Sequence, residues 1–257
     1  MLNNLNFVYF IDGNNLNLTL IQKSLETLIK FYDINLLIIF YENENTRNVL
    51  NEHINELKDK YCNYFSSYFK YVDSKIASMI LKPKCAINRG YLGNNTLIRF
   101  FLPYLLDCDN VYWVDNDILF NNNYSHELLN INPESTLMKC WAGRYEQNGS
   151  IIDEPINCGF MYINCKMWKN IPDIMVNILK YYIDNHDTIK YMNQSCYTYL
   201  ITEKYKDLCI LENNKLINVY VKLNTIIDKN VYIYHACGSP HKLEKTDNAF
   251  KQIVNEQ

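Results

Sequence analysis

Two carboxylates separated by one residue follow an apolar segment in the middle of the chain. Asp115 and Asp117 come directly after VYWV, and more apolar residues follow them, so both belong where a buried strand ends. Two carboxylates with a short spacer can hold a hard divalent cation. Aspartates at a strand exit also form Asx-turns, and an isolated Asp-x-Asp is compatible with either role.

Two further polar residues stand at equivalent places. Asp12 follows the apolar VYFI, and His235 follows VYIY. Because open α/β sheets bind ligands beyond the carboxyl ends of their strands, we expect these side chains and the aspartate pair at one edge. An imidazole beside two carboxylates tips the preference toward Mn²⁺ over Mg²⁺ or Ca²⁺ without deciding it. A single histidine ending an apolar strand is also a common hydrogen-bonded structural residue.

Composition argues against several other kinds of site. The chain of 257 residues has only seven glycines, with no Walker loop and no GxGxxG, so a phosphate ligand would need a metal and side-chain cations.

Nine cysteines form no CxxC, which indicates buried thiols in a reducing, cytoplasmic compartment. A net charge of −3 without blocks of like charge disfavours nucleic acid as a partner, and no apolar stretch is long enough for a transmembrane segment.

Alternating apolar and amphipathic segments predict the elements that position these residues. Strands are expected at 5–11, 34–41, 69–72, 111–114, 136–143, 159–165, 209–211, 216–221 and 231–238. Helices are expected at 18–28, 48–60, 96–106, 166–183, 194–202 and 242–257, with a short helix after residue 121. Without repeats or a flexible linker, the pattern predicts a single α/β domain over residues 1–257 with a mostly parallel sheet flanked by helices.

Five segments together resemble the family 8 glycosyltransferases, which are retaining enzymes that use nucleotide sugars. TLIRFFLPYLLDCDNVYWVDNDILF (96–120) is similar to their core signature, an arginine-bearing helix followed by an apolar strand and Asp-x-Asp. The other similar segments occur in the family's order: DGNN (12–15), NCGFMYINCKMW (157–168), NQ (193–194) and HACGSPHK (235–242). The resemblance implies a GT-A fold, with a nucleotide-binding half at 1–120 and a sugar- and acceptor-binding half at 121–257.

The same resemblance implies a role for each matching residue. Asp115, Asp117 and His235 would bind Mn²⁺, or else Mg²⁺, together with the diphosphate of a UDP-sugar donor. Arg99 and Lys242 would add positive charge near the diphosphate or the sugar, and Asn116 and Gly238 are also implied to bind the donor. Those implied at the uridine are Asp12 and Asn14, and those at the sugar are Asn157, Asn193 and Gln194.

The implied reaction transfers the sugar to a hydroxyl of an unknown acceptor, which could be a glycan, a protein or a lipid-linked sugar. Since the amide of Gln194 is a poor nucleophile, same-face attack is favoured over a covalent glycosyl-enzyme. A homodimer is a further expectation from the resemblance.

Three departures from the family pattern leave other functions open. Asn15 replaces an aromatic residue, Asn193 replaces an aspartate, and His241 displaces Lys242 by one position. One alternative is therefore a catalytically degenerate protein that only binds a nucleotide sugar. Another is an NYN-type metal-dependent ribonuclease, which predicts clustered basic residues and a domain of roughly 150 residues. A haloacid-dehalogenase phosphatase also uses Asp-x-Asp, but nearer the N-terminus.

Overall fold

The computed structural model describes residues 5–13, 15–73, 95–147, 150–185, 192–236 and 241–255. The chain opens with a βαβ unit, in which β1 (Asn6–Ile11) and β2 (Leu36–Tyr41) pair in parallel and are connected by α1 (Asn15–Phe31). The two strands and the helix between them are confirmed as the sequence predicts, although α1 extends beyond the expected 18–28 at both ends.

One apolar face of α1 packs against the sheet. Ile21, Leu25 and Leu28 are fully buried there, and the partly buried Leu18 contacts the same hydrophobic layer. Side chains three or four positions apart lie on one side of a helix, so these residues form a continuous stripe. Burial of this stripe holds α1 over the first two strands.

The rest of the first half continues the alternation of helices and strands. Its elements are α2 (Glu44–Tyr61), β3 (Ser66–Tyr71), α4 (Asn95–Leu105), β4 (Asn110–Val114) and β5 (Ile118–Phe120). Only a short turn, residues 115–117, separates β4 from β5. The aspartate pair therefore lies at the carboxyl end of β4, as the sequence predicts.

The second half contributes the remaining strands and helices. They are α5 (Ser125–Leu129), β6 (Met138–Gln147), β7 (Ser150–Asn164), α6 (Cys165–Asn170), α7 (Ile174–Asn185), α8 (Met192–Tyr199), β8 (Cys209–Glu212), β9 (Val219–Tyr220), β10 (Ile233–His235) and α9 (Lys242–Asn255). The prediction of one helix over 166–183 is wrong, because Ile171 is extended ahead of Pro172 and separates α6 from α7.

The described strands form one mixed sheet through both halves of the chain. Their order is β3-β2-β1-β4-β7-β6-β9-β10-β5, and β8 pairs with β6. The β4–β7, β6–β7 and β5–β10 pairs are antiparallel, whereas the other pairs are parallel. The predicted α/β class with a mostly parallel sheet is therefore confirmed.

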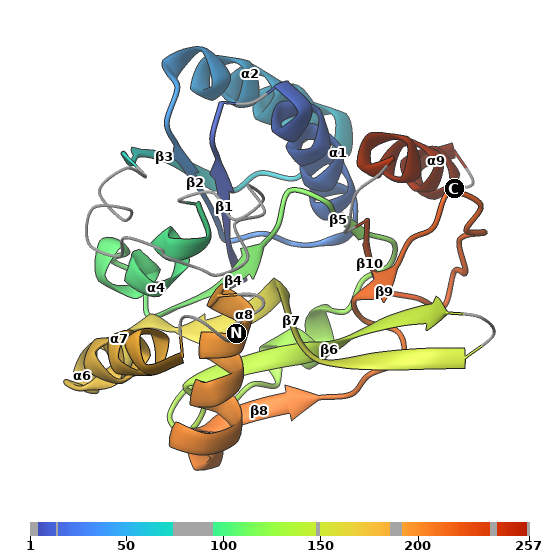
Figure 1. Cartoon of the computed structure of the whole chain (residues 1–257). Coiled ribbons are helices and arrows are strands. Elements are labelled where there is room, and N and C mark those ends of the chain that lie inside the picture. The colour runs from blue at the N-terminus through green and yellow to red at the C-terminus, as the bar shows by residue number, and fades with distance from the viewer. Residues whose placement is uncertain are drawn as a thin grey trace.

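Side chains of β1 alternate between two buried layers on opposite faces of the sheet. Phe7, Tyr9 and Ile11 belong to the layer beneath α1 and α2, while Val8 and Phe10 belong to the layer beneath α4, α6, α7 and α8. Figure 1 shows these two groups of helices on opposite sides of the sheet, with α9 beside α1. Successive side chains of a strand point to opposite faces of the sheet, so the position of a side chain along the strand determines which helices it contacts.

Asn43, in the loop after β2, provides a test of local stability in the half of the chain that was predicted to bind the nucleotide. The side chain of Asn43 caps α2 by accepting hydrogen bonds from the backbone N–H groups of Asn45 and Thr46. Since alanine leaves these groups without that acceptor, Asn43→Ala should lower the free energy of unfolding by about 1 kcal/mol. Urea denaturation measures this, with Asn43→Ser expected to lose much less. Equal losses in both variants would contradict the capping role.

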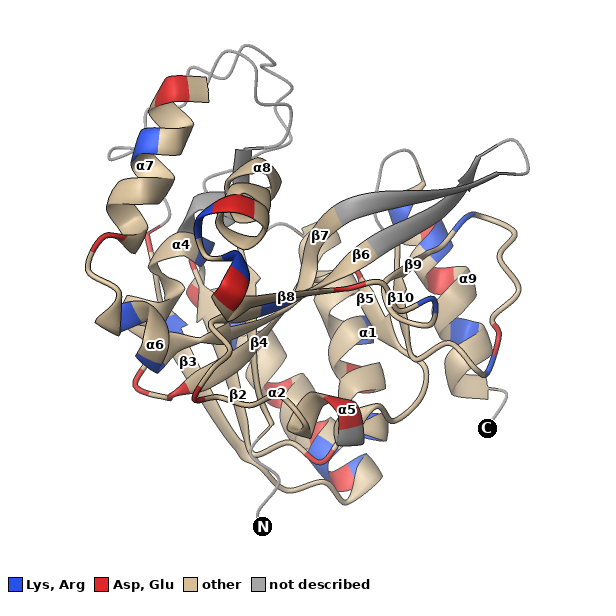
Figure 2. Ribbon diagram, turned by 90° about the horizontal axis from the view of Figure 1, so that it is seen from below, with Lys and Arg blue, Asp and Glu red and all other residues tan. Residues whose placement is uncertain are grey.

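Charged residues of both signs are interspersed over the described helices and loops, as Figure 2 shows. None of the helices in the described part of the chain is both long and apolar enough to span a membrane.

Candidate active site

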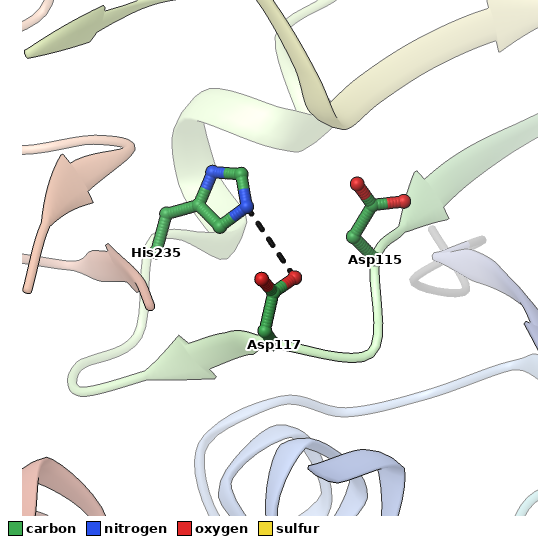
Figure 3. A group of neighbouring side chains, drawn as sticks. All are labelled: Asp115, Asp117 and His235. Atoms are coloured by element: carbon green, nitrogen blue, oxygen red, sulfur yellow. Dashed lines mark ion pairs between the residues drawn. The ribbon is translucent and has the colours of Figure 1, made fainter. Parts of the chain in front are cut away.

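Asp115, Asp117 and His235 converge at the carboxyl edge of the sheet. Asp115 directly follows β4, Asp117 directly precedes β5, and His235 ends β10, which pairs with β5 so that His235 lies opposite Ile118. One ligand atom from each of the three residues lies within 4.8 Å of the other two. Figure 3 shows the three side chains gathered at this point. Residues from the middle and the end of the sequence are therefore neighbours, as predicted.

Asp115 is held by the strand before it and by α4. Its Oδ1 accepts a hydrogen bond of 2.8 Å from Trp113 Nε1 and another from the guanidinium of Arg99. Arg99 also donates to the carbonyl of Cys158 at 2.9 Å and lies over the Trp113 ring. These contacts fix the direction of the carboxylate, because Arg99 is itself buried and bonded on two sides.

Asp117 is almost fully buried, with 3% of its surface exposed. Lys242 Nζ lies 2.8 Å from its Oδ2, and His235 Nε2 lies 3.4 Å from its Oδ1. Burial raises the pKa of Asp117, but the neighbouring His235 and Lys242 lower it more, so the pKa lies below its usual range. Asp117 therefore stays ionised at neutral pH, as a metal ligand must.

The chemistry of this donor set fits a divalent cation. Asn218 Oδ1 lies 3.0 Å from His235 Nδ1, and an amide oxygen can only accept, so Nδ1 carries a proton both in the charged ring, which lowers the pKa of Asp117, and in the neutral ring, which can bind a metal. In the neutral ring Nε2 directs a lone pair toward Asp117 Oδ1, and a cation between these two acceptors would satisfy both. Two carboxylates and one imidazole suit Mn²⁺, although they do not exclude Mg²⁺.

Gly159 makes room for the imidazole. It lies where the pairing of β6 and β7 shifts register, and its carbonyl accepts a hydrogen bond of 2.8 Å from Asp115 N. A Cβ at this position would lie 2.5 Å from His235 Cε1 and 2.9 Å from Asn157 Oδ1. Bulges of this kind are common beside active sites, where they redirect side chains.

The other residues predicted to bind the nucleotide-sugar donor are Asp12, Asn14, Asn116 and Gly238. Asp12 follows β1, and both of its carboxylate oxygens accept from Asn17 Nδ2, at 2.9 and 3.0 Å. Asn116 lies in the turn between the two aspartates, and its buried Oδ1 meets no donor in the described part of the chain. Asn14 and Gly238 lie outside the described residues.

The residues predicted at the sugar come from β7 and α8. Asn157 Oδ1 accepts from Gly159 N at 2.7 Å, and its Nδ2 donates to the hydroxyl of Tyr220. Gln194 lies on α8, as does Tyr197, whose ring packs against Phe100 of α4 at 4.8 Å. Asn193 precedes Gln194 on the same helix. Their roles toward a sugar stay predictions.

Three residues near the site were not predicted from the sequence. Trp113 donates a hydrogen bond to Asp115, Asn218 is hydrogen-bonded to His235, and the Tyr220 ring lies nearly perpendicular to that of His235, with the ring centroids 5.6 Å apart. Trp113 could have been proposed from its position at the end of β4, just before the aspartate pair. Asn218 and Tyr220 carry no local signal, because asparagine and tyrosine are abundant throughout this chain.

No protein-family model matches the chain, and no curated protein matches its sequence. Solved structures do match. The galactosyltransferase LgtC, in complex with donor and acceptor sugar analogues, superposes with a TM-score of 0.70 over 98% of this chain and 96% of LgtC, at 17% identity. The chain has the GT-A fold.

Two other glycosyltransferases share this fold. The apo form of GlyE from Streptococcus pneumoniae TIGR4 gives a TM-score of 0.62 at 12% identity, over 98% of this chain and 62% of GlyE. The bifunctional WbbM gives 0.59 at 14% identity, over 98% of this chain and 50% of WbbM. The fold implied by the family resemblance is therefore confirmed.

Proposed function

We propose that the protein is a retaining glycosyltransferase that uses Mn²⁺ to transfer a sugar from a UDP-sugar to an acceptor hydroxyl. The observation that supports this most is the convergence of Asp115, Asp117 and His235 at the carboxyl edge of a sheet with the LgtC fold. LgtC was solved with donor and acceptor sugar analogues, which supports a nucleotide-sugar donor and a sugar acceptor here.

A divalent cation bound to these three residues would supply Lewis-acid stabilisation of the negative charge that grows on the departing UDP. Arg99 and Lys242 already pair with Asp115 and Asp117, so the positive and negative side chains nearly balance one another. Such a site attracts a bare cation weakly. The diphosphate brings the negative charge that balances the cation, so the two ligands should bind together.

This charge balance gives a prediction for binding. Saturating UDP should raise the affinity for Mn²⁺ by about 10-fold or more, within the usual range for coupled sites. Electron paramagnetic resonance measures free Mn²⁺ during titration of the protein with and without UDP. Equal Mn²⁺ affinity in the two titrations would show that the diphosphate does not share the cation site.

We place Gln194 beside the anomeric carbon of the donor sugar, where the bond to UDP breaks. The active site of LgtC contains a glutamine, since an active-site mutant with glutamate in its place was solved. The amide oxygen of Gln194 would stabilise the positive charge that develops on the sugar. The acceptor oxygen bonds to the anomeric carbon as the bond to UDP breaks on the same face, and its proton passes to the leaving phosphate oxygen. Positioning and electrostatics would supply most of the rate.

Release of UDP from a panel of UDP-sugars, in the presence of Mn²⁺ and simple sugar acceptors, tests the proposal. Turnover with one donor supports it, and detection of the anomeric configuration by NMR tests retention. Mn²⁺-dependent UDP binding without turnover on any donor would favour the degenerate nucleotide-sugar binder, for which Asn193 is the motivating residue. Cleavage of RNA instead would favour the ribonuclease.

A further inference from the structure

The imidazole of His235 is held on several sides inside the protein. Only 4% of His235 is exposed, and Asn218, which is fully buried, lies 3.0 Å from its Nδ1. Asn218 Nδ2 donates to the carbonyl of Trp141, which orients the amide so that its oxygen faces the ring. The hydrogen bond from Nδ1 to Asn218 leaves Nε2 facing Asp117.

Asn218 adopts a backbone conformation that few residues accept. Its φ is +62°, in the left-handed region, where asparagine is tolerated much better than branched or bulky residues. Asparagine thus combines the required backbone with a side-chain acceptor of the right length. Glycine would keep the backbone but remove the acceptor.

Neighbouring residues limit other positions of the ring. The planes of the Tyr220 and His235 rings lie at 84° to each other, and the Tyr220 hydroxyl accepts a hydrogen bond from Asn157. On another side, Gly159 has no side chain, and even a Cβ there would overlap His235 Cε1. The surroundings therefore fix where the ring lies, while Asn218 fixes which nitrogen carries the proton.

We propose that Asn218 is a positioning residue that holds His235 in the Nδ1–H tautomer with Nε2 aimed at the aspartate pair, and thereby sets the affinity of the site for a divalent cation. This inference rests on the proposed function, because it requires His235 to be a ligand. Residues that orient a metal-binding histidine in this way commonly change metal affinity by about 10- to 100-fold when they are replaced.

Asn218→Gly is the most direct variant, because glycine accepts the left-handed backbone. With UDP present, this variant should bind Mn²⁺ about 10- to 100-fold more weakly than the wild type. Asn218→Asp keeps an acceptor for Nδ1 and should stay within about threefold of the wild-type affinity. Cys62→Gly is the matched control, since Cys62 also has a positive φ but ends α2. It should leave Mn²⁺ affinity unchanged.

Long-range ¹H–¹⁵N correlation of the imidazole nitrogens provides a readout that does not involve metal. The neutral form of His235 in the metal-free wild type should be the Nδ1–H tautomer, and Asn218→Gly should reduce the population of that tautomer. The His235 signals are assigned by their loss in His235→Ala. An Nε2–H tautomer in the wild type, or wild-type Mn²⁺ affinity in a folded Asn218→Gly protein, would overturn the inference but leave the proposed function intact. Failure of the wild type to bind Mn²⁺ with UDP would contradict the proposed function itself.

Discussion

Replacement of Asp117 by asparagine should reduce sugar transfer by about 10³-fold or more. The substitution preserves the shape of the side chain but removes the charge that faces His235 and Lys242. Lewis-acid stabilisation is worth several kcal/mol, and each 1.4 kcal/mol corresponds to about tenfold in rate. UDP release measured at saturating donor and Mn²⁺ gives the effect directly.

Asp184→Asn is a matched control for this prediction. Asp184 is exposed near the end of α7, and its substitution also removes one negative charge from the protein. It should leave the rate unchanged. A folded Asp117→Asn protein with the rate of the control would show that this carboxylate takes no part in transfer.

Gly159→Ala should have the second large effect. The new Cβ would lie 2.5 Å from His235 Cε1, in a region where the ring cannot move without breaking its contact with Asn218. Overpacking of this kind costs about 1–3 kcal/mol in stability. We expect Mn²⁺ affinity in the presence of UDP to fall by about 10-fold or more, because the displaced ring no longer faces the aspartates. Denaturation and Mn²⁺ titration measure the two effects.

A double-mutant cycle shows whether the new methyl group acts through the imidazole. In a His235→Ala background the overlap with the ring is absent, so Gly159→Ala should cost much less stability than in the wild type. Equal costs in the two backgrounds would place the strain elsewhere, for example at Asn157 Oδ1, which is 2.9 Å from the same Cβ.

Much of this site could be predicted because it lies at the ends of apolar strands. The segments before Asp12, Asp115 and His235 have the composition of buried strands, and the carboxyl ends of such strands meet at one edge. The convergence of Asp115 with Asp117 and His235 follows from this rule once β10 pairs beside β5. The ordered similarity to a known family added the identity of the fold.

The details that could not be predicted depend on long-range contacts. Arg99 was expected near the diphosphate or the sugar, and the structure pairs it with Asp115, which requires α4 to pack beside β4. Asn218 reaches His235 only because β9 and β10 pair in parallel. Pro172 was visible in the sequence, yet the apolar periodicity on both sides of it favoured one helix over two.

A crystal structure of the protein with UDP and Mn²⁺, recorded so that manganese gives an anomalous signal, tests the central claim most directly. We predict one manganese peak bonded to an oxygen of Asp115, an oxygen of Asp117 and Nε2 of His235, with oxygens of the UDP diphosphate in its remaining positions. Bound UDP with manganese absent from these three side chains would contradict the account.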